Sequence, residues 1–211
     1  MTEDSPSLQS SYDRVADRYA EDYFGELERK PFDCEVLDKF ANEVRGQGAV
    51  CEIGCGPGQV ARYLKDRGVD IHGIDLSEEM VRAASTLNPD ISFASGNMLG
   101  LKAADNSLAG IVSFYAIIHL KRDEMGRALA EMKRVLAPGG RLLISFHEGD
   151  GELHRDEWYG QTVSIDVTLL SRAEVTGYLE EAGLKVDSIV DRPPYDFEYA
   201  TRRVYVQASK A

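Results

Sequence analysis

Residues 50–58 have the sequence Val50-Cys51-Glu52-Ile53-Gly54-Cys55-Gly56-Pro57-Gly58. The apolar residues 49–53 predict a short strand, and the glycines predict a tight turn whose backbone a ligand can approach closely. Residues 59–67 then follow a helical pattern that Gly68 closes. This strand, turn and helix together predict a ligand site at the turn of an α/β fold.

The chemistry of this turn indicates which ligand it suits. Its glycine spacing is GxGxG, whereas turns that bind a dinucleotide pyrophosphate use GxGxxG, and Glu52 would repel a pyrophosphate. Asp75 ends the next predicted strand, where a carboxylate can accept hydrogen bonds from both hydroxyls of a ribose. We therefore expect a nucleoside that carries a positive charge and no phosphate.

Strands and helices alternate along most of the chain. Strands are predicted at residues 49–53, 69–74, 91–94, 108–115 and 141–146, and helices at residues 59–67, 77–87 and 122–136. A helix at residues 171–182 precedes two late strands, residues 184–190 and 203–208, whose short connection favours antiparallel pairing. The prediction is an α/β, Rossmann-like fold: a seven-stranded, mostly parallel sheet with helices on both faces and the last strand antiparallel.

Three segments lie outside this alternation. Residues 1–10 are small and polar, which predicts a disordered tail, and residues 11–211 are expected to form a single domain. Residues 12–24 and 31–44 show helical spacing of apolar and aromatic residues. Residues 147–167 are polar and aromatic without a clear period, so no regular structure is predicted there.

The composition argues against several classes of partner. The chain has 36 acidic and 24 basic residues, a net charge of -12, and no basic run, so nucleic acid is not an expected partner. No apolar stretch is long enough for a membrane helix, and the polar, acidic start is not typical of a signal peptide. We expect a cytoplasmic protein with free thiols at its 3 cysteines.

At this point the sequence resembles the class I S-adenosylmethionine-dependent methyltransferases, from about Tyr12 to the C-terminus. The motifs that carry the resemblance are CEIGCGPG (51–58), GIDLSEEM (73–80), SFASGNM (92–98), EMKRVLAPGGRLLIS (131–145) and LSRAEVTGYLEEAGLKV (170–186). The resemblance implies that S-adenosylmethionine is the cofactor and that residues 11–45 form a helical lid over it. It says little about the methyl acceptor.

The resemblance also implies which residues contact the cofactor. They are Tyr12, Tyr19, Glu52, Gly54, Cys55, Gly56, Gly58, Asp75, Leu76, Met80, Asn97, Met98 and Phe114. Tyr12 and Tyr19 would lie over the sulfonium, because aromatic faces attract cations. Asn97 departs from the pattern, since the family usually has an aspartate there, although an amide oxygen can still accept a hydrogen bond from the adenine amino group.

The acceptor should bind beside residues that follow the fourth and fifth strands, and residues 147–170 are predicted to form its side of the site. Candidate catalytic residues there are His119, His147 and Glu148. Candidate acceptor-binding residues are Tyr115, His119, His147, His154, Trp158 and Tyr195. Each also has an ordinary structural interpretation as a packed or hydrogen-bonded side chain. No metal site is expected, because the histidine spacing matches no standard ligand pair.

The leading interpretation is in-line methyl transfer to a small molecule, with O- or N-methylation favoured, by a monomer or homodimer. Three alternatives stay open. One is a non-catalytic protein that binds the cofactor in a regulatory role. Another is an NAD-dependent oxidoreductase, against which the GxGxG spacing and Glu52 argue. The last is a methyltransferase acting on nucleic acid or protein.

Overall fold

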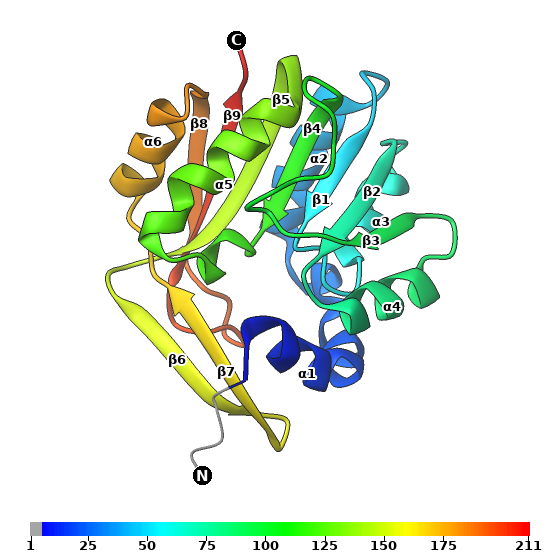
Figure 1. The fold of residues 1–211 in the computed structure, drawn as a ribbon, viewed down its shortest axis with the longest axis vertical. Coiled ribbons are helices and arrows are strands. Elements are labelled where there is room, and N and C mark those ends of the chain that lie inside the picture. The colour runs from blue at the N-terminus through cyan, green and yellow to red at the C-terminus, as the bar shows by residue number, and fades with distance from the viewer. Residues whose placement is uncertain (1–5) are drawn as a thin grey trace.

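The computed structural model describes residues 6–211, and its centre is a seven-stranded sheet in the order β3-β2-β1-β4-β5-β9-β8 (Figure 1). The strands are β1 (Val50–Ile53), β2 (Ile71–Asp75), β3 (Ser92–Ser95), β4 (Leu108–Phe114), β5 (Leu136–Glu148), β8 (Lys185–Arg192) and β9 (Arg202–Ser209). Strands β1 to β5 are parallel, whereas β9 is antiparallel to both β5 and β8. The predicted fold class is therefore confirmed.

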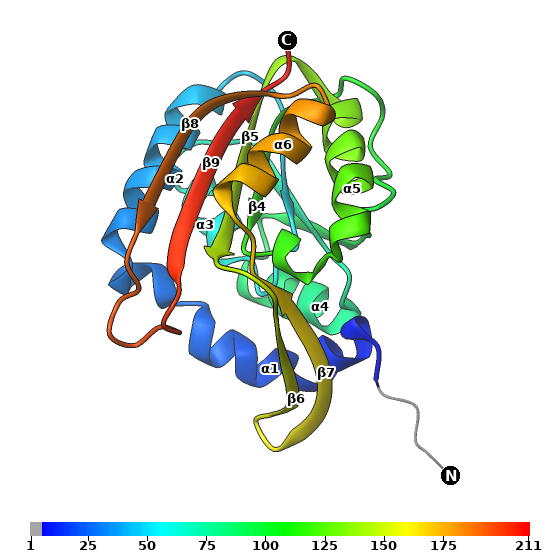
Figure 2. The same ribbon diagram turned by 90° about the vertical axis from the view of Figure 1, so that its left-hand side faces the viewer.

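Helices cover both faces of this sheet, with α5 and α6 on one side and α2 and α3 on the other (Figure 2). The helices are α1 (Leu8–Tyr23), α2 (Pro31–Val44), α3 (Gln59–Lys65), α4 (Glu78–Leu87), α5 (Arg122–Val135) and α6 (Arg172–Glu181), with short 3-10 helices η1 (Glu26–Arg29) and η2 (Ile117–His119). Within residues 6–211, none of them combines the length and apolar character needed to cross a membrane.

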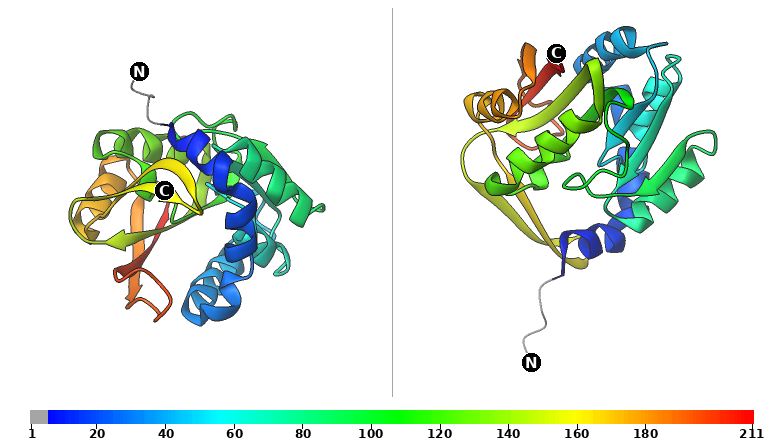
Figure 3. Two further views of the ribbon diagram at one scale, coloured as in Figure 1. Left: turned by 90° about the horizontal axis from the view of Figure 1, so that it is seen from below. Right: turned by 45° about the horizontal axis from the view of Figure 1, so that its top comes forward.

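Residues 152–168 form a hairpin that the sequence did not predict. Strands β6 (Glu152–Trp158) and β7 (Gln161–Thr168) pair as a separate two-stranded sheet. Positive φ angles at Tyr159 and Gly160 give the hairpin a tight turn. Strand β6 shows no alternation of apolar and polar residues, because it carries polar residues on both of its faces. In β7, by contrast, Val163 and Ile165 are buried. Seen from below, α1 and this hairpin lie across the same end of the sheet (Figure 3).

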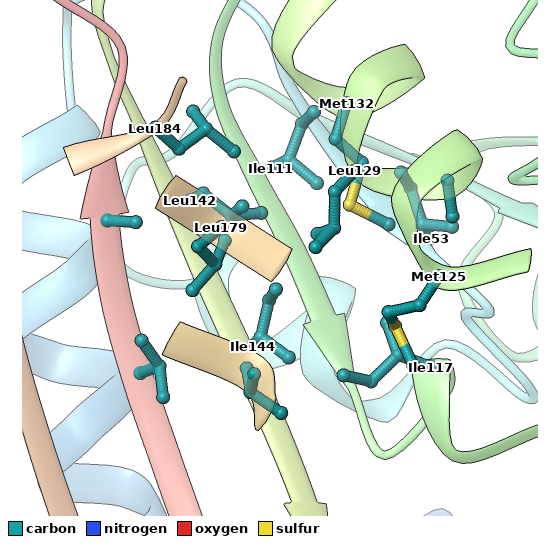
Figure 4. Packing of buried hydrophobic residues seen from close by; sticks show 14 of the residues in the cluster. Ile53, Ile111, Ile117, Met125, Leu129, Met132, Leu142, Ile144, Leu179 and Leu184 are labelled. Atoms are coloured by element: carbon teal, nitrogen blue, oxygen red, sulfur yellow. The ribbon is translucent and has the colours of Figure 1, made fainter. Parts of the chain in front are cut away.

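Two hydrophobic clusters, one on each face of the sheet, form most of the core. Adjacent residues of β4 point to opposite faces, so Ile111 packs in one cluster and Val112 in the other. In the first cluster Leu129 and Met132 of α5 lie over the sheet residues (Figure 4). Burial on both faces explains why β4 is nearly continuously apolar.

Several predicted boundaries were wrong. Helix α1 begins at Leu8, because Ser7 accepts a hydrogen bond from the Ser10 amide and caps it, so residues 8–10 are helical rather than disordered. Residues 1–5 of the predicted tail lie outside the described residues. Strand β5 begins at Leu136, where it already pairs with Leu108. Helix α2 packs on a face of the sheet, so within the predicted 11–45 lid it is α1 and the segment around η1 that line a cavity.

The core makes a direct prediction about stability. Leu129 is fully buried, so Leu129→Ala should lower the free energy of unfolding by about 2–5 kcal/mol, through lost transfer energy and the cavity left behind. The same substitution at Leu87, which is 42% exposed, should cost much less. Urea denaturation of the two variants measures the difference, and equal losses would contradict this account of the core.

Candidate functional site

A cavity of about 1140 Å³ lies at the carboxyl ends of the parallel strands, and α1 and the β6–β7 hairpin contribute to its walls. This is where ligands bind in open α/β sheets, at the point where the strand order reverses between β1 and β4. The volume exceeds the range of about 300–1,000 Å³ typical of a pocket for one ligand. The cavity therefore has space for two ligands side by side.

The glycine turn and Asp75 form one wall of the cavity. Gly56 has a φ of +51° and donates its amide hydrogen to Asp75 Oδ2 at 2.8 Å. The other carboxylate oxygen, Oδ1, accepts from the Ser77 amide at 2.9 Å. Burial raises the pKa of Asp75, although these amide hydrogens act against the rise. Each carboxylate oxygen keeps a lone pair with which it can accept from a ligand hydroxyl.

Glu52 and Gly58, which were predicted to contact the cofactor, have mainly structural roles. Glu52 lines the cavity but is 2% exposed, and its Oε2 accepts from the Ala61 amide at 2.8 Å, which ties β1 to the first turn of α3. Burial raises its pKa well above the usual value. Gly58 is not among the cavity residues. A Cβ there would lie 2.8 Å from both Asn88 and Phe93, so this glycine is required for packing.

The remaining predicted cofactor residues line the cavity. They are Tyr12, Tyr19, Gly54, Cys55, Leu76, Met80, Asn97, Met98 and Phe114. The Asn97 amide oxygen already accepts from the Leu99 backbone amide at 2.8 Å. Its second lone pair remains for a ligand.

An aromatic cluster of Tyr12, Tyr19, Tyr23 and Trp158 brings α1 and the hairpin together in the cavity. The Trp158 ring centroid lies 6.2 Å from that of Tyr12 and 5.4 Å from that of Tyr19. Burial raises the pKa of all three tyrosines, so they stay neutral. Neutral aromatic faces are suited to a cation such as a sulfonium. Tyr23, which sequence reasoning missed, lies one helical turn after Tyr19.

His119 is held by the protein at both ring nitrogens. Its Nδ1 lies 2.9 Å from the backbone oxygen of Asp166, which can only accept, so Nδ1 carries the proton. Its Nε2 then accepts from the Tyr12 hydroxyl at 2.8 Å. Burial lowers its pKa, which keeps the ring neutral. His119 therefore connects α1 to the hairpin, and this arrangement argues against a role as general base.

Tyr115 and His147 line the cavity together, with ring centroids 5.3 Å apart. Tyr115 has a φ of +57°, which is rare for a residue with a side chain and concentrates at functional sites. Its hydroxyl lies 2.8 Å from that of Tyr205. His147 Nδ1 lies 2.8 Å from Thr201 Oγ1.

Three predicted residues have other partners. Glu148 is not a cavity residue, since its carboxylate pairs with Arg172 at 2.7 Å and its pKa is lowered by that bond. Tyr195 is also outside the cavity lining, and its hydroxyl accepts from the Phe32 amide. His154 is at the cavity rim, but its ring pairs with Asp166, and both side chains are more than half exposed.

A buried group of charges behind Tyr115 was not predicted. Arg192 joins Asp33 and Glu198, and Lys30 joins Glu198 and Glu26. Lys30, Glu26 and Glu198 also line the cavity. Glu26, Lys30 and Asp33 lie near one end of the chain and Arg192 and Glu198 near the other, so no local sequence pattern connects the two sets.

The residues present fit S-adenosylmethionine. Asp75 offers carboxylate oxygens suited to a ribose, and the aromatic cluster offers faces suited to a sulfonium. A Cβ added to Gly56 would come within 4 Å only of Tyr19, so the turn has an open side. The acidic residues beside the turn, Glu52 and Asp75, offer no positive charge, which makes the turn unsuited to a pyrophosphate.

Comparison with known proteins agrees with this chemistry. A family model described as a methyltransferase domain matches residues 50–140. A demethylmenaquinone methyltransferase of Renibacterium salmoninarum is 32% identical over 96 residues, 46% of this chain and 40% of that protein. A malonyl-[acyl-carrier protein] O-methyltransferase of Pseudescherichia vulneris is 29% identical over 139 residues, 66% of this chain and 53% of that protein. The chain spans about half the length of the curated relatives it matches.

The fold is also similar to that of solved structures. A methyltransferase dependent on S-adenosylmethionine, from Methanosarcina mazei, superposes with a TM-score of 0.74 at 18% identity, over 81% of this chain and 96% of that one. The family model thus describes residues 50–140 as a methyltransferase domain, and the solved structure shows that the chain shares its fold.

Proposed function

We propose that the protein binds S-adenosylmethionine against the glycine turn and transfers its methyl group to a small molecule in the same cavity. The supporting observation is the joint lining of one cavity by Asp75, the open side of Gly56 and the aromatic cluster. Its volume of about 1140 Å³ leaves space for an acceptor beside the cofactor. O- and N-methylation are the favoured reactions.

The protein's own contribution is to hold and enclose the reactants. When bound, S-adenosylmethionine supplies an electrophilic methyl carbon on a sulfonium. Asp75 accepts hydrogen bonds from the ribose, and Leu76 and Met80 pack against the adenine. Tyr12 and Tyr19 lie beside the positive charge, and the bond from Tyr12 to His119 keeps α1 over the site. Such alignment and exclusion of water account for rate in a displacement reaction.

Three observations favour a small acceptor. Residues of α1 and of the hairpin line part of the cavity, which can therefore enclose a compact molecule. The net charge of -12 disfavours a nucleic acid. Two relatives are described as acting on demethylmenaquinone and on a malonyl group of an acyl-carrier protein.

The cofactor assignment is tested by calorimetry with S-adenosylhomocysteine. Asp75→Ala should weaken its binding by about 1–3 kcal/mol, the cost of losing a charge-assisted hydrogen bond. Asp70→Ala is the matched control, because Asp70 is an exposed aspartate just before the same strand. Equal affinity of the Asp75→Ala and Asp70→Ala variants would refute the ribose assignment. Binding of NAD in place of S-adenosylhomocysteine would favour the oxidoreductase, and binding without turnover on a broad acceptor panel would favour a regulatory protein.

The closure of α1 is tested by a double-mutant cycle. Tyr12→Phe and His119→Leu remove the two partners of one hydrogen bond. Each should destabilise α1, and the double variant should show a coupling of about 0.5–1.5 kcal/mol, the net value of such a bond. Hydrogen exchange of the α1 amides measures it. Additive effects would mean that the bond does not hold α1 over the cavity.

A further inference from the structure

His147 and Arg203 are opposite each other where the end of β5 pairs with the start of β9. Residues directly opposite in an antiparallel pair point to the same face, so the two side chains are neighbours. Both line the cavity. Neither the family model, which matches residues 50–140, nor the relatives' descriptions assign them a role.

Thr201 determines which nitrogen of His147 carries the proton. Arg203 Nη1 lies 2.6 Å from Thr201 Oγ1, and a guanidinium can only donate, so this oxygen accepts. Among the described residues the hydrogen of the Thr201 hydroxyl has no other acceptor than His147 Nδ1, 2.8 Å away, so we assign the donor role in this bond to Thr201. With Nδ1 as an acceptor, the neutral ring carries its proton on Nε2.

The ring should remain neutral at physiological pH. Burial, followed by the charge of Arg203, lowers the pKa of His147 to about 3. The other charged or titratable groups that act on it are Glu198, which opposes the shift, and Lys30 and His119, which add to it. A group that is so weakly basic cannot remove a proton from an acceptor near neutral pH.

His147 and Arg203 each keep a hydrogen-bond donor that the protein does not use within residues 6–211. In the described part of the chain, His147 Nε2 has no protein partner. Arg203 uses Nη1 for its bonds to Tyr199 and Thr201, and its Nη2 only approaches Glu198, at 3.7 Å. The pair therefore presents a neutral N–H and part of a guanidinium, a combination suited to an anionic oxygen.

Nearby charges are balanced, so an added anion meets no net repulsion there. The buried group contains the cations Lys30, Arg192 and Arg203 and the carboxylates Glu26, Asp33 and Glu198. This contrasts with the acidic surface of the whole chain.

The carboxylates of the cavity are already engaged by protein donors. Glu198 is paired with Arg192, which holds its pKa at about 2 against the effect of burial. The others accept from the following groups: Glu26 from Lys30, Glu52 from Ala61, Asp75 from Gly56, Glu124 from Lys121, Glu21 from Arg18 and Asp22 from Tyr159. Beside the donors of His147 and Arg203, each carboxylate of the cavity is thus already held by at least one protein donor.

We propose that His147 and Arg203 form an acceptor subsite for an ionised acidic oxygen, so that the methyl acceptor is a carboxylic acid, or a phenol or enol acidic enough to be ionised at neutral pH, that binds as its anion. This rests on the proposed function. In the reaction, a lone pair of the anionic acceptor forms the new bond to the methyl carbon, and the pair of the broken C–S bond stays on sulfur. No proton moves, so no general base is required. Thr201 is a positioning residue, because it acts through the His147 ring.

The protonation state of His147 can be tested without an acceptor. In long-range ¹H–¹⁵N NMR spectra the wild-type His147 ring should show the Nε2–H tautomer, and Thr201→Val should allow a mixture. Because the folded-state pKa is depressed, the unfolded chain takes up the proton first as pH falls below about 6.5. Wild type should therefore lose stability relative to His147→Gln between about pH 6.5 and 3. A charged ring or an Nδ1–H tautomer at neutral pH would overturn the proposal.

The subsite itself is tested by calorimetry with benzoate and benzylamine, on protein saturated with S-adenosylhomocysteine. Benzoate should bind and benzylamine should not. Arg203→Met should weaken benzoate binding by about 10–100-fold, as should His147→Leu, whereas His147→Gln, which keeps an N–H donor, should retain most of the affinity. Arg202→Met is the matched control, since Arg202 is the adjacent residue, pairs with Asp191 and does not line the cavity.

Binding of S-adenosylhomocysteine to each variant shows that its fold is intact, and it tests the proposed function separately. If S-adenosylhomocysteine does not bind to wild type, the proposed function fails. If it binds but benzoate does not, or benzylamine binds more tightly, the acidic-acceptor subsite fails alone. Equal effects of Arg202→Met and Arg203→Met would also overturn it. If the Arg203→Met variant does not fold, the subsite is still tested by the binding of benzoate and benzylamine to wild type and by the two His147 variants.

Discussion

The hydrogen bond from the Gly56 amide to the Asp75 carboxylate joins the two parts of one cavity wall. It connects the turn after β1 to the end of β2, and both strands must be parallel and in register for the groups to meet at 2.8 Å. Asp75 is therefore held by backbone amides from both sides, Gly56 and Ser77. A carboxylate that is oriented in this way before binding loses little conformational freedom when it accepts hydrogen bonds from a ligand.

The other wall depends on contacts between segments far apart in sequence. Ser11 of α1 accepts from the Ser164 amide of β7 at 2.8 Å, and Arg14 donates to the Thr162 carbonyl at 2.7 Å. With the bond from Tyr12 to His119, these contacts attach the first helix to the hairpin and to the loop after β4. The cavity is thus enclosed by bonds whose partners are more than a hundred residues apart.

That the glycine turn and Asp75 line one cavity was predictable because their signals are local. The strand, glycine turn and helix of residues 50–67 lie within one short stretch, and Asp75 ends the next strand, so parallel pairing brings them together. The acceptor side was predicted less well. Glu148 has the residue type of a catalytic acid, but its carboxylate forms ion pairs with Arg172 and Arg202 and does not line the cavity. Arg203 carried no signal, since arginine in a strand near the C-terminus has no local pattern to mark it.

By itself, the sequence determined the layered α/β fold, the order of its main elements and the glycine turn, because apolar periodicity and glycine conformation act over a few residues. Only the tertiary structure decided how the histidines are used. His119 became a link between α1 and the hairpin, His154 pairs with Asp166 at the rim, and His147 became a neutral donor beside Arg203. Protonation and orientation depend on partners brought together by folding, and the spacing of residues along a chain does not encode those partners.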